Sequence, residues 1–417
     1  MGRFIIEGGA RLGGRIRVQG AKNSVLPILA ATVAVGRPCV IHNCPRISDV
    51  ESTLGILKAL GCEVHRSGNS VSVDSSRLTV VDIPDSLMRE MRSSVIFLGA
   101  LISRTGEAKI CAPGGCDIGI RPIDLHLFAM KKLGVNITED FGRISCKCRR
   151  TKGAKITLSF PSVGATENII LAALRCSGTT TIINAAREPE ITDLASFLNS
   201  CGARINGAGE STLTVEGVER FFPTQYTVMP DRIVACTYMA AAAVTGSDIM
   251  LDDVRTGHMS SVIQCFEQCG CRINSSSGRL RISAPARLHD MGTVRTMPYP
   301  GFPTDCQSLI MTMASIADGT TVICENIFEN RFRNASELNR MGASISVHDK
   351  IAVINGVPKL QGAQVCAHDL RAGAALIVAG LCAEGKTTVE NICYIDRGYE
   401  SAEKDFNSLG AKIKRIE

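Results

Sequence analysis

The sequence has no tryptophan, and aromatic residues make up only 4% of its 417 residues. Proteins that bind single-stranded nucleic acid stack the bases on aromatic side chains, so this scarcity argues against a nucleic-acid partner. No stretch approaches the roughly 20 uninterrupted apolar residues of a membrane-spanning helix. The first residues, MGRFIIEGGARLGG, lack the apolar core and cleavage pattern of a secretory leader. We therefore expect a cytoplasmic protein without a membrane partner.

The chain also lacks a large excess of charge of one sign. Its 46 Lys and Arg against 40 Asp and Glu give a net charge of +6, spread along the sequence. A broad basic face for a phosphate backbone is therefore not expected. We expect the positive charge to gather locally around small anions instead.

Cysteine, in contrast, is abundant, with 18 residues. In a long chain without a secretory leader this number predicts reduced thiols, most of them small core residues. The two Cys-x-Cys pairs, Cys146 with Cys148 and Cys269 with Cys271, have neither Cys-x-x-Cys partners nor clustered histidines. The sequence therefore predicts no metal site, and nothing in it indicates a cofactor.

The most informative positive feature is an internal repeat. One glycine series separates a helix-like segment from a strand-like one at Gly61, Gly134, Gly202, Gly270, Gly342 and Gly410. Subtraction of these numbers gives spacings of 68 to 73 residues. A second series marks an earlier point of each unit at Gly36, Gly106, Gly178, Gly246, Gly319 and Gly385. Six units of one design are thus predicted.

Each unit is predicted to begin with a buried helix, because segments such as 25–35, 233–244 and 373–382 are apolar on nearly every face. A glycine then ends the helix, and a β-branched stretch such as GTTTIINA predicts a strand. A loop, an amphipathic helix such as ITDLASFLNSC, the second glycine and a hairpin follow. One more strand can lead into each unit.

The sixth unit is shorter than the others, since the chain ends at AKIKRIE, within the expected hairpin. The N-terminal segment RFIIEG is a spare strand, so we expect it to complete the last sheet. Six units taken as three plus three then predict an α/β protein of two domains. The first spans 20–229, and the second is discontinuous and comprises 1–19 plus 230–417.

Unusual polar residues recur at the start of the apolar helices. They are Lys22, Asn23, Arg92, Ser162 to Thr166, Asp231, Asp305, Asp369 and Arg371. A helix N-terminus offers free N–H groups to a phosphate or carboxylate. Simple capping is the other explanation, and we favour it for Asp231 and Ser162. Lys22 and Arg371 are different, because a cation at a helix start opposes the dipole, which suggests an anion shared between them.

A second set of polar residues lies in the loop before the amphipathic helix. It comprises Asp49, Cys116, Arg121, Glu188, Arg331 and Arg397. Cys116 follows two glycines, and Arg121 lies five residues further on. A cation beside an exposed thiol lowers its pKa and raises its reactivity, although a loop cysteine among so many can also be incidental.

At these positions the chain carries motifs that resemble those of the UDP-N-acetylglucosamine 1-carboxyvinyltransferase family. In the first half they are GAKNS at 20–24, PGGCDIGIRPIDLH at 113–126, SVGAT at 162–166 and AREPEI at 186–191. In the second half they are FPTD at 302–305, ENRF at 329–332, DLRA at 369–372 and IDRGYE at 395–400. The resemblance spans the whole chain and implies two inside-out α/β barrel domains, each of three βαβαββ-type repeats.

The resemblance also implies a reaction. Enolpyruvyl transferases of this family add phosphoenolpyruvate to UDP-N-acetylglucosamine and then eliminate phosphate, without a metal or cofactor. By this resemblance Cys116 handles the proton at the methylene carbon, and Asp305 accepts the proton of the sugar 3-hydroxyl. Phosphoenolpyruvate is expected to contact Lys22, Asn23, Arg121, Arg331, Arg371 and Arg397, of which Lys22 and Arg397 are also expected to be catalytic. The UDP-sugar is expected to contact Arg92, Arg121, Pro122, Ile123, Asp124, Leu125, Ser162, Val163, Gly164, Asp305 and Ile327.

Two positions depart from family members that have lysine there, namely Ser48 and Phe160. Which contacts these two residues make, near the closing loop and the uridine, is therefore left undecided. Phe160 can pack against uracil instead. For Asp49 and Glu188 we expect structural ion pairing or domain closure, not catalysis. The alternatives are the sister enolpyruvyl transferase that acts on shikimate 3-phosphate, a non-catalytic repeat scaffold, and an enzyme that processes nucleic-acid ends. The oligomeric state is left open.

Overall fold

The computed structural model describes residues 2–111, 114 and 122–417. These residues form two compact units. One contains 20–111, 114 and 122–229, and we call it the Lys22 unit; the other contains 2–19 and 230–417, and we call it the Asp305 unit. Each unit is a mixed α/β structure whose sheets combine parallel and antiparallel strand pairs.

Three apolar helices pack on one another in the core of the Lys22 unit. They are α1 (Lys22–Val35), α4 (Phe97–Thr105) and α6 (Val163–Ala173). Three further helices pack around them, namely α2 (Ser48–Ala59), α5 (Asp124–Lys132) and α7 (Pro189–Ser200). Two short ones, α3 (Asp85–Glu90) and the 3₁₀ helix η1 (Arg92–Ile96), precede α4. Because a helix that is apolar on all faces is stable only when covered, the burial follows from the sequence.

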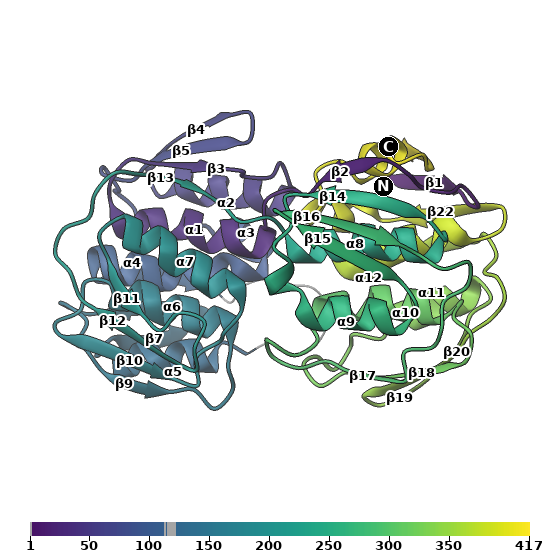
Figure 1. The fold of residues 1–417 in the computed structure, drawn as a ribbon. Coiled ribbons are helices and arrows are strands. Elements are labelled where there is room, and N and C mark those ends of the chain that lie inside the picture. Colours follow the sequence, from purple (N-terminus) through teal and green to yellow (C-terminus); the bar gives the residue numbers. More distant parts are fainter. Residues whose placement is uncertain (1, 112–113, 115–121) are drawn as a thin grey trace. The chain divides into compact units, whose positions relative to one another are not determined.

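Three sheets cover these helices (Figure 1). The first has the order β13-β3-β5-β4, with β3 (Cys39–His42), β4 (Glu63–Ser67), β5 (Ser70–Asp74) and β13 (Thr224–Thr227). The second, β6-β8-β7, contains β6 (Glu107–Cys111), β7 (Asn136–Asp140) and β8 (Arg143–Lys147). The third, β11-β12-β10-β9, contains β9 (Lys155–Thr157), β10 (Thr179–Ile183), β11 (Arg204–Asn206) and β12 (Thr212–Glu216).

The Asp305 unit follows the same plan. Its core helices α8 (Arg232–Val244), α10 (Gln307–Ala314) and α12 (Leu370–Cys382) pack on one another. The other helices are α9 (Ser260–Gln268), α11 (Asn334–Arg340) and α13 (Ala402–Ser408), with 3₁₀ helices η2 (Thr256–His258), η3 (Thr304–Cys306) and η4 (Ile392–Arg397). The predicted apolar and amphipathic helices are thus confirmed.

Its three sheets have the orders β15-β16-β14-β2, β17-β18-β20-β19 and β21-β22-β1-β23. The strands of the first are β2 (Arg15–Arg17), β14 (Asp248–Asp252), β15 (Arg272–Ser276) and β16 (Arg279–Ser283). Those of the second are β17 (Thr293–Arg295), β18 (Thr320–Cys324), β19 (Ser344–His348) and β20 (Ile351–Asn355). Those of the third are β1 (Arg3–Glu7), β21 (Gln364–Cys366), β22 (Lys386–Glu390) and β23 (Lys412–Ile416).

The glycines of the repeat have a shared backbone conformation. All twelve residues of the two series have positive φ, between 61° and 110°. In this left-handed region a Cβ atom is costly, so glycine fits without strain. Gly36 and Gly106 cap α1 and α4 directly, and the other glycines lie in the turns that follow their helices. The repeat that the sequence shows is therefore a repeat of turns as well as of helices.

The N-terminal strand completes the last sheet, as predicted. Strand β1 lies between β22 and β23 and pairs with both in antiparallel register, Phe4 opposite Val389 on one side and Arg415 on the other. The leading strands are also present, and two of them are exchanged. Strand β2 precedes α1 in sequence but pairs with β14, whereas β13 precedes α8 but pairs with β3.

The described cysteines are free thiols, and most of them are buried, which confirms their interpretation as core residues. Within residues 2–111, 114 and 122–417, no helix is both long enough and apolar enough to cross a membrane.

The central position of β1 leads to a stability prediction. Phe4 is fully buried, and the Arg415 guanidinium lies 4.9 Å from its ring centroid. Truncation in Phe4→Ala removes that packing, so we expect the unfolding free energy to fall by about 3–5 kcal/mol. Urea denaturation measures this, with Arg3→Ala, an exposed residue of the same strand, as the control. Equal stability of the two variants would contradict the central role of β1.

Candidate functional site

Lys22 and Asn23 are the first two residues of α1. The Lys22 Nζ lies 2.6 Å from the Asp49 Oδ2, and their side chains are only 11% and 6% exposed. This buried ion pair offsets the unfavourable position of a cation at a helix start, as expected for a structural role of Asp49. Arg371 also has a carboxylate partner within its own unit. An anion shared between Lys22 and Arg371 is therefore not needed to offset these two charges at helix starts.

Three stretches predicted to hold the UDP-sugar meet around one buried histidine in the Lys22 unit. His126, in the first turn of α5, follows Pro122 to Leu125, and Gly164 of α6 packs against its ring. Its Nδ1 lies 2.7 Å from the Asn168 amide nitrogen. The same amide donates to the Val95 carbonyl in the η1 helix that Arg92 begins, and its oxygen accepts from the Gly99 N–H.

The electrostatics of this junction favour a neutral imidazole. Burial and, to a smaller extent, the positive charge of Arg92 lower the pKa of His126 to about 4, whereas Asp124 acts in the opposite direction. With Nδ1 accepting from Asn168, the neutral ring carries its proton on Nε2. His126 and Asn168 therefore fix the relative positions of α5, α6 and the η1 helix.

The capping interpretation is confirmed for two residues. The Ser162 hydroxyl accepts from the Ala165 N–H at the start of α6, and the Asp231 carboxylate accepts from Ile233 and Val234 at the start of α8. Asp369 caps α12 in the same way. A capping side chain occupies helix N–H groups that an anion would otherwise use.

In the Asp305 unit, a carboxylate lies between two buried guanidinium groups. Asp305 belongs to η3, and its oxygens lie 2.7 Å from the Arg331 Nη2 and 2.8 Å from the Arg371 Nη2. The two arginine side chains are 3% and 7% exposed, whereas that of Asp305 is 25% exposed. Burial favours the neutral acid, but Arg371 and Arg331 outweigh it and hold the Asp305 pKa well below its ordinary value. Asp305 is therefore ionised and accessible.

Glu325 is a buried acid next to the turn that contains Asp305, and it was not predicted from the sequence. Glu325 is 1% exposed, and its carboxylate accepts from the hydroxyls of Thr296 and Thr304 at 2.9 Å each. It also accepts from the backbone N–H groups of Ile327 and Phe328. Glu325 thus connects the turn that contains Asp305 to the loop that contains Ile327.

Arg397 ends the η4 helix, which packs against α12. The turn after it is held by Gln19, another residue that the sequence reasoning missed. The Gln19 amide nitrogen donates to the Gly398 carbonyl, and its oxygen accepts from the Glu400 N–H. Gln19 therefore positions the backbone next to Arg397.

Cys116 and Arg121 lie outside the described residues, but Gly114 shows what the preceding loop requires. Its N–H donates to the Met88 carbonyl, and a Cβ atom at this position would lie 1.7 Å from the Arg89 carbonyl oxygen. No side chain fits at that distance, so the first glycine of the pair allows a close approach of two backbones.

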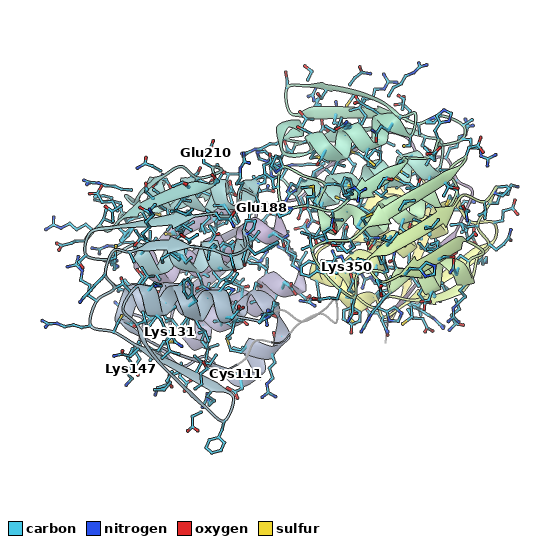
Figure 2. All side chains as sticks on the ribbon, turned by 90° about the horizontal axis from the view of Figure 1, so that it is seen from below. Cys111, Lys131, Lys147, Glu188, Glu210 and Lys350 are labelled. Atoms are coloured by element: carbon cyan, nitrogen blue, oxygen red, sulfur yellow. The ribbon has the colours of Figure 1, made fainter. Side chains whose placement is uncertain are left out.

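The remaining predicted positions are peripheral to these clusters. Ser48 is exposed at the start of α2, and Phe160 is 44% exposed. Glu188, which is labelled in Figure 2, directly precedes α7. The nearby Glu167 is buried, and burial together with Glu190 and Glu188 holds its pKa well above the ordinary value. Among the described residues, no group of three or more His, Cys, Asp or Glu side chains is arranged to hold a metal.

The state of His126 leads to a pH prediction. Its pKa is lower in the folded protein than the ordinary value of about 6.5. Its contribution to stability is therefore complete above pH 6.5 and decreases as the pH falls toward 4, by about 3 kcal/mol in total. We expect His126→Gln, whose amide oxygen can still accept from Asn168, to be less pH-dependent in urea denaturation over this range. An unchanged pH profile would contradict the buried neutral imidazole.

Three comparisons with known proteins place the chain among relatives. The profile of a family described as EPSP synthase (3-phosphoshikimate 1-carboxyvinyltransferase) matches residues 6–406. Over 100% of both chains, the protein is 52% identical to UDP-N-acetylglucosamine 1-carboxyvinyltransferase 2 of Caldanaerobacter subterraneus subsp. tengcongensis. It is 46% identical to UDP-N-acetylglucosamine 1-carboxyvinyltransferase 1 of Carboxydothermus hydrogenoformans, over 100% of this chain and 99% of the relative.

Solved structures agree. The enolpyruvyl transferase NikO from Streptomyces tendae superimposes with a TM-score of 0.90 at 27% identity, covering 100% of this chain and 99% of the other. EPSP synthase from Acinetobacter baumannii gives 0.75 at 19% identity, with full coverage of both chains. The second likeness concerns the fold alone.

Proposed function

The chain belongs to the UDP-N-acetylglucosamine 1-carboxyvinyltransferase family of enolpyruvyl transferases, and we propose that it transfers the enolpyruvyl group of phosphoenolpyruvate to the 3-hydroxyl of UDP-N-acetylglucosamine. The observation that carries this proposal is the 52% identity to a relative of that name over the full length of both chains. We further propose that the enzyme is cytoplasmic and catalyses the first committed step of peptidoglycan synthesis. Through this step it contributes to cell-wall biogenesis, cell shape and cell division. The two compact units are then its two inside-out barrel domains, each of three repeats.

The sister reaction on shikimate 3-phosphate is less well supported. Five relatives named for the UDP-sugar reaction are 43–52% identical to this chain, whereas the EPSP synthase structure is 19% identical. The deciding experiment measures phosphate release from phosphoenolpyruvate with each acceptor in turn. We expect release with UDP-N-acetylglucosamine, inhibited by fosfomycin. Release with shikimate 3-phosphate alone, or with neither acceptor, would contradict the proposal.

In the proposed mechanism, the sugar 3-hydroxyl adds to C2 of phosphoenolpyruvate while C3 gains a proton, which gives a tetrahedral ketal phosphate. Loss of phosphate and of a proton from C3 then leaves the enolpyruvyl ether. Asp305 accepts the hydroxyl proton, and Cys116 handles the proton at C3. Lys22, Arg121 and Arg397 stabilise the negative charge of the departing phosphate.

The ion pairs of Asp305 suggest how its basicity is controlled. Arg331 and Arg371, expected to hold phosphoenolpyruvate, are bound to Asp305 in the structure. A carboxylate whose pKa they keep low is a weak base. We propose that the anionic groups of phosphoenolpyruvate compete for these guanidinium groups, so the Asp305 pKa rises when the substrate binds. Asp305 then becomes an effective base only when the second substrate is present.

The role of Cys116 is tested by two substitutions. Cys116→Ser is expected to lose nearly all turnover and all labelling by fosfomycin, because a hydroxyl is a much weaker acid than a thiol. Cys116→Asp is expected to keep turnover and resist the drug, since a carboxylic acid can still deliver a proton. Phosphate release and mass spectrometry measure both effects, and full turnover of the serine variant would remove Cys116 from the mechanism.

The role of Glu325 is tested against an exposed carboxylate of the same loop. Glu325→Ala removes four hydrogen bonds, one to Thr296, one to the Thr304 turn and two to the 327–328 backbone. A displacement of about 1 Å can cost on the order of 100-fold in rate, so we expect kcat/KM for UDP-N-acetylglucosamine to fall 10- to 100-fold. The exposed Glu329 provides the control Glu329→Ala, expected to be close to wild type. If both variants have wild-type kinetics and fold normally, Glu325 does not position the site.

A further inference from the structure

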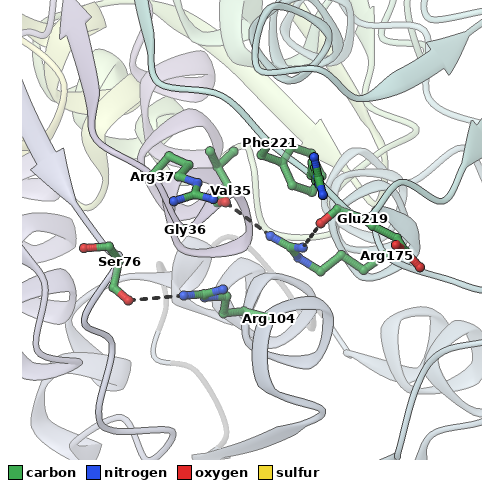
Figure 3. Close-up of a pocket in the computed structure, with 9 residues that line it drawn as sticks. Val35, Gly36, Arg37, Ser76, Arg104, Arg175, Glu219 and Phe221 are labelled. Atoms are coloured by element: carbon green, nitrogen blue, oxygen red, sulfur yellow. Dashed lines mark hydrogen bonds between the residues drawn. The ribbon is translucent and has the colours of Figure 1, made fainter.

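The Lys22 unit contains a second group of cations, apart from the residues discussed above. A cavity of about 240 Å³ is lined by four arginines, Arg37, Arg104, Arg175 and Arg220. The rest of its lining comprises Val35, Gly36, Ser76, Glu219 and Phe221. Figure 3 shows Arg37, Arg104 and Arg175 around this space. We call it the four-arginine cavity.

The cavity lies at the opposite ends of the core helices from the candidate site. Helix α1 begins at Lys22 and ends at Val35, and α6 begins after Ser162 and ends just before Arg175. Arg104 lies in the last turn of α4, which continues the η1 helix begun by Arg92. Since α1 has 14 residues, the two ends lie about 20 Å apart. The cavity is therefore distinct from the candidate active site.

The positive charge of this cavity is not balanced by acidic side chains. In the described part of the chain, none of its four arginines forms an ion pair, whereas Arg204 of the same unit, which is exposed like Arg37 and Arg220, pairs with Glu216. The single carboxylate of the lining, Glu219, is 84% exposed and lies 4.0 Å from Arg150. Four guanidinium groups and one carboxylate leave a net charge of about +3 on the lining.

One of the four arginines has a structural role. Arg175 donates to the carbonyls of Ala34 and Val35 at the end of α1 and to that of Glu219, and it stacks on Phe221. Burial, together with the charges of Arg104 and Arg37, lowers the pKa of Arg175 to about 10. Guanidinium groups gathered close enough for their charges to act on Arg175 mark a place where an anion would be stabilised.

The other three arginines have guanidinium N–H groups that make no hydrogen bond with the described residues. Arg104 makes one hydrogen bond, of 3.3 Å to the Ser76 carbonyl. Arg37 and Arg220 make none with the described residues, although both line the cavity. Helix capping therefore accounts for Arg175 but not for these three, and guanidinium groups bind phosphate oxygens through paired donors.

We propose that the four-arginine cavity binds a small anion of two or more negative charges, of the diphosphate class. The charge of the lining matches such an anion. The volume is below the roughly 300 Å³ at which sites for drug-sized ligands begin, and Phe221 is already covered by Arg175, so the cavity has no free aromatic face for a nucleotide base. This proposal is independent of the proposed reaction.

Calorimetric titration with inorganic pyrophosphate, at constant ionic strength in chloride, tests the proposal. Arg37→Gln/Arg220→Gln removes two cavity cations that make no described hydrogen bond, so the fold should be retained, and the melting temperature without ligand checks this. Arg143→Gln/Arg204→Gln removes the same charge from exposed, ion-paired positions of the same unit. Lys22→Gln/Arg397→Gln removes cations of the candidate active site.

We expect pyrophosphate to bind at least tenfold more weakly to the cavity variant than to the wild type. Affinity should stay within about twofold in the exposed-charge variant, and the cavity event should persist in the active-site variant. Three results would overturn the proposal. They are no binding to the wild type, an equal loss in the exposed-charge variant, and binding that is lost only with Lys22 and Arg397.

Discussion

Each unit must bury three helices that are apolar on nearly every face. A side chain in the middle of such a helix contacts only other core residues, so polar groups that act on a ligand must lie at the helix ends. In the Lys22 unit the N-terminal ends carry Lys22, Arg92 and Ser162, and the C-terminal ends lie at the four-arginine cavity. The architecture thus separates two cationic regions by about the length of a helix.

The second organising interaction is the pairing of Asp305 with Arg331 and Arg371. Two nearly buried guanidinium groups are stabilised by one accessible carboxylate, and that carboxylate stays ionised in return. Hydrogen bonds to Glu325 hold the turn that contains Asp305 and the loop that contains Ile327 together. A site built in this way holds its cations in place before a substrate arrives. In the mechanism that we propose, an anionic substrate then replaces the carboxylate as their partner.

Much of the fold could be predicted from the sequence, because helix burial and left-handed turns leave local signatures. The apolar segments, the twelve glycines and the spare strand at 3–7 are examples. The strands with which β2 and β13 pair were not predictable, since strand pairing over more than 180 residues has no local signal. For the same reason the partners of Lys22 and Arg371 were missed, as was Glu325, which looks like an ordinary acid at the end of a strand. His126 lies in the PGGCDIGIRPIDLH motif, and the apolar residues around it in the sequence are a signal of its burial.

The central claim, that Asp305 becomes the base when phosphoenolpyruvate takes over its arginines, is tested most directly by carbon-13 NMR of the aspartate carboxyl groups. The Asp305 signal is assigned by its loss in Asp305→Asn and titrated with and without phosphoenolpyruvate. We expect a pKa well below the ordinary value of about 3.9 in the free enzyme. We expect the pKa to rise clearly when phosphoenolpyruvate is bound. The same pKa in both states would show that Arg331 and Arg371 stay with Asp305, and would contradict this account of its role.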